Sequence, residues 1–139
     1  MAGEIGKLRS KIGDSEKITI NLGYVDLGHV DLLVQDGFYS NRTDFIRTAI
    51  RNQLSVHAEA AKKSIVRQTL ELGIRHYSRD DLEQVKAAGE RLRIKVLGLA
   101  SIADDVPAAL ALATIDSITV LGALHASHEL KTALADRIR

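Results

Sequence analysis

The sequence predicts an α+β protein in which one strand and two helices precede a small α/β domain of about three strand–helix units. Two observations lead to this fold class. Near the N-terminus, apolar residues alternate with polar ones and then recur at helical spacing. The second half of the chain repeats itself with a period of 24 residues. We expect a flexible arm at residues 1–15, a first domain at residues 16–63 and a second domain at residues 64–139.

The first predicted strand lies at residues 16–22, where the side chains alternate in character. Ile18, Ile20 and Leu22 share one face, and Lys17, Thr19 and Asn21 share the other. Gly23 ends the alternation. Apolar residues then recur at helical spacing, which predicts a short helix from about residue 26 to residue 35. We expect Gly37 to close this helix, because glycine tolerates the left-handed backbone of a helix end.

A second helix is predicted to begin at Ser40 or Asn41, both of which are good N-cap residues. Asn41 with Asp44 three residues later resembles a capping box. The pattern allows this helix to continue to about residue 63. Its apolar stripe consists of Phe45, Ile46, Ala49, Ile50 and Leu54.

The repeat in the second half predicts parallel strands side by side, each followed by a helix. A shift of 24 residues aligns Ile94, Val96, Leu97 and Gly98 with Ile118, Val120, Leu121 and Gly122. A fainter earlier copy aligns Leu70, Leu72 and Leu82 with Ile94, Val96 and Val106. The last two strands are apolar at nearly every residue, which is typical of strands that are covered on both faces. Gly98 and Gly122, which lie in these two strands, indicate close packing between repeats.

The first domain is too small to bury its own apolar faces, and a lone strand leaves two unpaired edges. We therefore predict an intertwined homodimer in which residues 17–22 of two chains pair antiparallel. The paired strands form a ribbon that is narrow enough for the major groove of DNA. The predicted dimer core contains Ile18, Ile20, Leu22, Phe45, Ile46 and Ile50.

Residues 14–57 resemble the ribbon-helix-helix DNA-binding proteins of the CopG, Arc and MetJ type. The resemblance is carried by the alternating strand Lys17–Leu22 and by the turn and capped helix start Gly37–Arg47. It implies a sequence-specific transcriptional regulator, in most cases a repressor, that binds double-stranded DNA. It also implies that Lys17, Thr19 and Asn21 contact bases and that Ser40, with the backbone amides of Asn41 and Arg42, contacts a DNA phosphate.

The chemistry of these residues agrees with those roles. Lysine donates to guanine O6 and N7, asparagine can pair with adenine, and threonine offers a hydroxyl and a methyl group. A helix N-terminus presents free N–H groups to an anion. A solvated strand face and an ordinary helix cap are the alternative interpretations of the same residues.

Composition limits the other classes of function. The 139 residues carry 19 Lys and Arg against 18 Asp and Glu, so no bulk basicity indicates nucleic acid. The chain has no cysteine, which excludes disulfides and thiolate chemistry. It also has no secretory signal and no apolar run that could cross a bilayer, so we expect a cytoplasmic protein without membrane contact.

We expect neither an enzyme nor a cofactor or metal site, because the five histidines are scattered and no catalytic constellation is recognisable. His125 and His128 straddle a strand end and a helix start. Two alternative functions stay open, an antitoxin whose C-terminal half binds a toxin and an accessory DNA-binding protein of plasmid transfer or partition. We predict that residues 64–139 join dimers into tetramers or higher assemblies, and a small-molecule effector site there is a further alternative.

Overall fold

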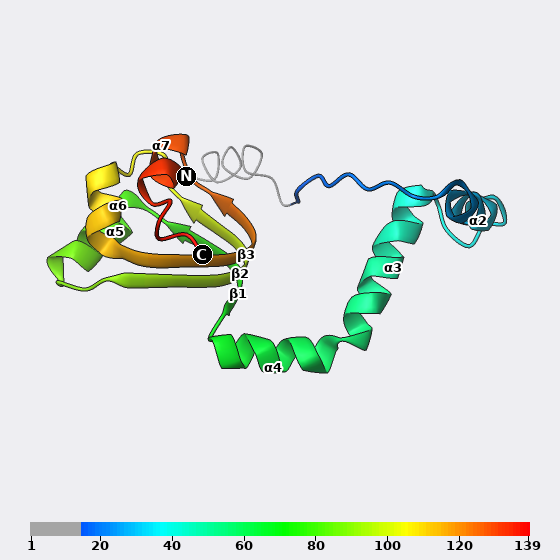
Figure 1. Ribbon diagram of the computed structural model, residues 1–139, viewed down its shortest axis with the longest axis horizontal. Helices are drawn as coiled ribbons and strands as arrows, with labels where there is room; N and C mark the ends of the chain where they lie inside the picture. Colours follow the sequence, from blue (N-terminus) through cyan, green and yellow to red (C-terminus); the bar gives the residue numbers. More distant parts are fainter. Residues whose placement is uncertain (1–14) are drawn as a thin grey trace. The chain divides into compact units, whose positions relative to one another are not determined.

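The computed structural model describes residues 15–139, which divide into two compact units, residues 15–64 and residues 65–139. These residues form six helices and one three-stranded sheet, so the predicted α+β class is confirmed (Figure 1). The predicted flexible arm, apart from Ser15, lies outside the described residues.

Residues 16–23 of the first unit form neither helix nor strand in the single chain. The predicted strand is therefore not present in one isolated copy. A strand requires hydrogen bonds to a neighbouring strand, and the described part of this unit contains none. The first described helix, α2 (Tyr24–Gln35), begins two residues earlier than predicted, with Gly23 as its N-cap.

Gly37 closes α2 as predicted. Its backbone has φ +85°, in the left-handed region. The Phe38 N–H donates to the Leu33 carbonyl at 3.0 Å, and the Gly37 N–H donates to the Val34 carbonyl at 3.1 Å. This hydrogen-bond pair is the Schellman motif, which satisfies the last carbonyls of the helix and turns the chain toward the next one.

The second helix, α3 (Arg42–Val56), has Asn41 as its N-cap, which is one of the two predicted starts. It does not continue to residue 63. The His57 N–H donates to the Leu54 carbonyl at 3.2 Å, which tightens the last turn. A separate helix, α4 (Ala58–Gln68), follows directly.

The first unit lacks a core of its own. Val30 is the one fully buried residue within residues 15–64. The apolar side of the predicted strand is open, with Ile18 72% and Ile20 55% exposed. On α3, Ile50 and Leu54 are also exposed. Since apolar burial supplies most of the favourable free energy of folding, this unit needs further surface to cover it.

The second unit alternates strands and helices in the order β1 (Glu71–Tyr77), α5 (Arg79–Ala87), β2 (Leu92–Ile102), α6 (Ala108–Thr114), β3 (Ile115–His125) and α7 (His128–Ala133). The three strands are parallel and lie in sequence order. Buried residues from the helices, such as Leu82, Leu110 and Leu130, form one cluster with Ile94, Val96 and other strand residues. Figure 1 shows the three helices around this side of the sheet.

The helices of the second unit begin in different ways. Ser78 and Asp81 form a full capping box at α5. Hydrogen bonds from the Ser78 backbone and side chain hold the pKa of Asp81 below its usual value. At α6 the N-cap is Pro107, which makes no side-chain capping hydrogen bond.

The observed register pairs residues 24 apart between β2 and β3, including Ile94 with Ile118 and Gly98 with Gly122. The fainter copy was aligned wrongly by one residue. Leu72 pairs with Leu97 rather than Val96, a shift of 25 residues. A slip of one residue exchanges the two faces of a strand, and Leu72 is accordingly 68% exposed whereas Val96 is fully buried.

Three glycines, Gly73, Gly98 and Gly122, stand in one row across the sheet and set this register. All three have positive φ, between 123° and 139°. A Cβ atom on Gly98 would lie 2.1 Å from the Gly73 carbonyl oxygen, and one on Gly122 would lie 2.1 Å from the Gly98 carbonyl oxygen. The close packing predicted at Gly98 and Gly122 is confirmed, and Gly73 extends it to β1.

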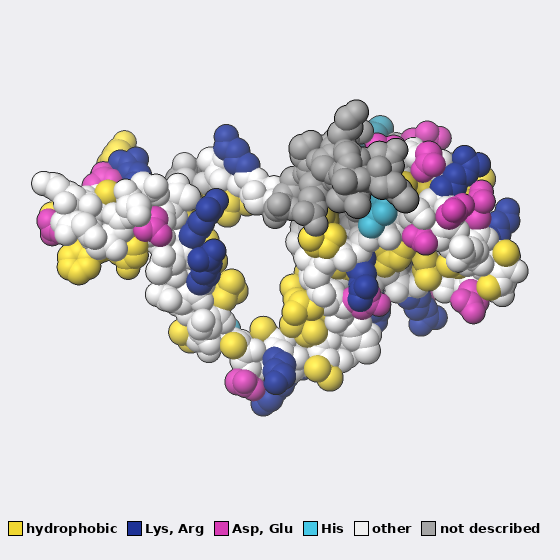
Figure 2. Space-filling model, turned by 180° about the vertical axis from the view of Figure 1, so that it is seen from behind, with side chains coloured by type: hydrophobic (Ala, Val, Ile, Leu, Met, Phe, Trp, Pro, Cys, Tyr) yellow, Lys and Arg dark blue, Asp and Glu magenta, His cyan; other side chains and the backbone are white. Residues whose placement is uncertain are grey.

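Only one face of the sheet is covered by the described residues. Side chains that alternate with the buried ones make up the other face, and we call its apolar centre the open face: Leu72, Ile74, Leu97, Leu99, Leu121 and Ala123. The same side of the sheet carries Lys95 and Thr119 toward the strand starts and the row His76–Ser101–His125 toward the strand ends. Ile74 is 68% exposed and Leu121 is 50% exposed. Within residues 15–139, therefore, the second face of the last two strands is only partly covered, in contrast to the expectation. Figure 2 shows hydrophobic side chains at the surface of both units.

The edges of the sheet differ. Residues 137–139 form backbone hydrogen bonds with the outer edge of β3. The Ile118 N–H donates to the Arg137 carbonyl at 2.9 Å, and the Arg139 N–H donates to the Ile118 carbonyl at 2.8 Å. The Arg137 guanidinium also donates to the carbonyls of Leu112 and Ile115. The β3 edge of the sheet is thus partly closed.

Candidate nucleic-acid interface

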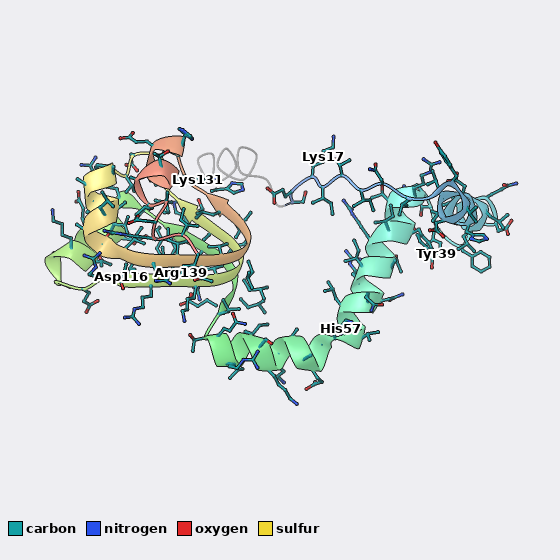
Figure 3. All side chains as sticks on the ribbon, viewed as in Figure 1. Lys17, Tyr39, His57, Asp116, Lys131 and Arg139 are labelled. Atoms are coloured by element: carbon teal, nitrogen blue, oxygen red, sulfur yellow. The ribbon has the colours of Figure 1, made fainter. Side chains whose placement is uncertain are left out.

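The three predicted base-contacting residues lie on the segment that leads into α2. Lys17, Thr19 and Asn21 are all exposed. Figure 3 shows the Lys17 side chain projecting from this segment. Alternate residues of an extended chain point to the same side, so the three side chains together offer an ammonium, a hydroxyl and an amide.

The predicted phosphate-contacting residues lie together at the start of α3. The Asn41 side-chain oxygen accepts the Asp44 N–H at 2.8 Å, and the Asp44 carboxylate accepts the Ser40 N–H at 2.9 Å. The backbone N–H groups of Arg42 and Thr43 belong to the first turn, where an α-helix has no internal acceptors for them. The Ser40 side chain is exposed beside them. These groups can donate hydrogen bonds to an anion.

The Arg42 guanidinium binds Asp31 of α2 through two hydrogen bonds, of 2.8 and 2.9 Å. The hydrogen bonds lower the pKa of Asp31 and raise the pKa of Arg42. This pair ties the start of α3 to α2. Asp31 was not singled out from the sequence, because nothing in the spacing of residues 31 and 42 predicts that they meet.

Tyr39 is a second residue that sequence reasoning missed. Its ring packs edge-on against Phe45, with 5.0 Å between the ring centroids and 84° between the planes. This contact spans the turn before α3, as a hydrophobic staple does. An aromatic residue two positions before the N-cap, together with another one turn into the helix, is the signal that could have identified it. Figure 3 labels Tyr39 in this turn.

The base-contacting and phosphate-contacting groups are separate in one chain. No hydrogen bond or ion pair joins them within residues 15–64. One chain offers a single row of three polar side chains, and its apolar row is open to solvent. A second copy that pairs along residues 17–22 would supply a second row and cover the apolar one.

The part of the chain that the structure describes holds no group of three His, Asp or Glu side chains that could bind a metal ion. His125 ends β3 and His128 begins α7, as predicted. Across residues 15–139, no helix is long and apolar enough to cross a membrane.

The comparison with known families defines the class of this protein: it is a DNA-binding transcriptional regulator. The chain belongs to the ribbon-helix-helix transcriptional regulator family, whose model matches residues 13–131. The match extends beyond the resembling residues 14–57 and includes most of the second unit. Families of this kind are generally not enzymes. No curated protein and no solved structure matches the chain.

Proposed function

We propose that the protein is a cytoplasmic, homodimeric repressor of transcription that inserts a two-stranded antiparallel ribbon, one strand from each chain, into the major groove. The exposed apolar row of the first unit carries this proposal. Ile18, Ile20 and Leu22 alternate with polar residues, and Val30 alone is fully buried in residues 15–64. Antiparallel pairing of residues 17–22 satisfies the unpaired backbone and directs the apolar row inward.

The opposite row of the ribbon then faces the DNA bases. Each dimer presents Lys17, Thr19 and Asn21 twice, related by a two-fold axis, so a pseudo-palindromic site fits it. Lysine donates to guanine O6 and N7, and asparagine can bind adenine N6 and N7 in a bidentate manner. Side chains of this length can reach base edges only when the ribbon lies within the groove.

The start of α3 positions the ribbon by contacting a phosphate. The backbone N–H groups of Asn41 and Arg42 and the Ser40 hydroxyl are the donors. Arg42 contributes its backbone rather than its guanidinium, because the guanidinium is held by Asp31. The Asp44 carboxylate, which accepts the Ser40 N–H, limits the strength of this contact by repelling a second anion.

Dimethyl sulfate protection on DNA from upstream of the gene tests the groove assignment. The reagent methylates guanine N7 in the major groove and adenine N3 in the minor groove. We expect the protein to protect guanine N7 at two symmetric half-sites and to leave adenine N3 reactive, because the ribbon occupies the major groove only. Protection of adenine N3 in place of guanine N7 would contradict the proposal.

We propose that residues 64–139 join DNA-binding dimers into tetramers. This unit has its own buried core, from Leu82 to Leu134, which favours a preformed assembly domain over an antitoxin segment that folds on a toxin. A chain that ends at Lys63 is expected to form dimers in place of tetramers in light scattering and to lose operator cooperativity. An unchanged number of chains per assembly and unchanged cooperativity would exclude this role.

A further inference from the structure

We propose that the open face of one chain packs against the open face of a second copy, with the strands of the two sheets running antiparallel. The inference rests on the proposed function and identifies the surface by which the second units of different dimers associate. Three properties of the sheet carry it: the apolar character of the open face, the charge at its two ends, and its size.

The open face has the composition of a buried surface. None of its six side chains is charged or polar, and they stand in two rows across the strands, Leu72–Leu97–Leu121 and Ile74–Leu99–Ala123. On β1, Leu72 and Ile74 are each 68% exposed. A contiguous apolar patch of this kind marks an interaction surface. Because it offers no donor to phosphate or sugar, its partner is an apolar surface rather than DNA.

The two ends of the sheet have opposite charge, which selects a copy of the same unit as the partner. Parallel strands place all their amino ends at one edge and all their carboxyl ends at the other. Around the amino ends lie Arg67, Arg91, Arg93, Lys95 and Arg139, with Glu71, Glu90 and Asp116 among them. Around the carboxyl ends lie Asp80, Asp81, Asp104, Asp105 and Glu129, with Arg79 among them.

A two-fold axis perpendicular to the strands therefore brings the basic end of each sheet over the acidic end of the other. An axis along the strands would place like charges together, which disfavours association. The antiparallel arrangement also sets β1 against β1 and β3 against β3. The apolar rows of the two copies then meet in the centre of the interface, as in an aligned sheet packing.

The size of the open face explains why the first unit is needed as well. Three strands about 4.8 Å apart, with the two apolar rows spanning about four residues of each at about 3.3 Å per residue, present on the order of 200 Å² per copy. The resulting interface of roughly 400 Å² is smaller than the roughly 1,200–2,000 Å² of stable complexes. Each ribbon dimer carries two second units, so two dimers can make this contact twice, and the second contact forms at the high effective concentration that the first one creates.

Pulsed electron-spin resonance on the full-length chain tests the arrangement. Because the chain contains no cysteine, a Glu83→Cys variant carries one nitroxide label per copy, on the exposed side of α5 and away from the open face. In the proposed arrangement the two sheets lie face to face, with one helix layer outside each and about 10 Å between layers. The distance between the two labels is then expected to have a narrow distribution at about 30–40 Å. We expect Ile74→Glu in the labelled chain to abolish this narrow peak. Gln84→Glu adds the same charge on α5 and is expected to preserve it.

The outcomes separate the two proposals. A labelled chain that is monomeric in light scattering overturns the homodimer and the inference together. An associated chain with a broad distribution, or with a narrow peak that Ile74→Glu leaves unchanged, overturns the open-face contact alone. A narrow peak below about 20 Å would instead indicate pairing of the β1 edges, which places both α5 helices in one layer, and it also overturns the contact.

Discussion

Replacement of Gly98 by alanine is expected to prevent residues 65–139 from folding. The added Cβ would lie 2.1 Å from the carbonyl oxygen of Gly73, a backbone atom in the neighbouring strand. The φ of +139° adds strain for any residue with a side chain. Strain and overpacking together cost roughly 3–6 kcal/mol, which is comparable with the whole stability of a small domain. Urea unfolding followed by circular dichroism measures the loss.

Gly73→Ala is the matched control for this prediction. Gly73 has nearly the same backbone, with φ +126°, but nothing lies within 4 Å of the position its Cβ would take. Its substitution should therefore cost only the conformational strain, about 1–3 kcal/mol. Equal losses for the two variants would mean that the contact between strands plays no part. Gly122→Ala, which meets the Gly98 carbonyl oxygen at 2.1 Å, should behave like Gly98→Ala.

Replacement of Ile20 by lysine is expected to separate the dimer and to abolish specific DNA binding. Ile20 is 55% exposed in the single chain, and in the proposed dimer it lies in the core beside its own copy. The substitution removes about 1.5–3 kcal/mol of apolar burial from each chain. It also places two like charges in an apolar interior, where an unpaired charge is costly. Light scattering and anisotropy report the two losses.

Asn21→Lys provides the comparison for Ile20→Lys, since it introduces the same side chain one residue later on the opposite face. That variant should keep the mass of the wild type while its base preference changes. If Ile20→Lys also kept the wild-type mass, the apolar row would not be the dimer core. If both variants lost mass, the alternation of faces in residues 17–22 would be wrong.

The sequence was most informative where local chemistry decides the structure. Gly37 closes α2 because only a residue that tolerates φ near +85° suits that position. Asn41 begins α3 because its side chain satisfies a free N–H in the first turn. Ser78 and Asp81 do the same for α5. These features depend on residues close together in the chain, so the sequence alone suffices to predict them.

Features that depend on distant residues or on a second chain were harder to predict. The strand at residues 16–22 needs a partner that a single chain lacks. The Asp31–Arg42 pair depends on how α2 and α3 meet. The register of β1 is set by the glycine row, which adds one residue to the 24-residue period. The open face was mistaken for a covered one, because apolar residues on both faces of a strand do not reveal which chain covers them.

The most direct test of the central claim is fluorescence anisotropy on DNA from upstream of the gene, with the wild type beside Lys17→Ala/Asn21→Ala and a salt titration of each. We expect the wild type to prefer this DNA over random DNA. The double variant should stay dimeric, lose that preference and retain a weaker, salt-dependent affinity, since phosphate contacts persist without base contacts. Equal preference in the two proteins, or no binding by either, would contradict base recognition by the ribbon.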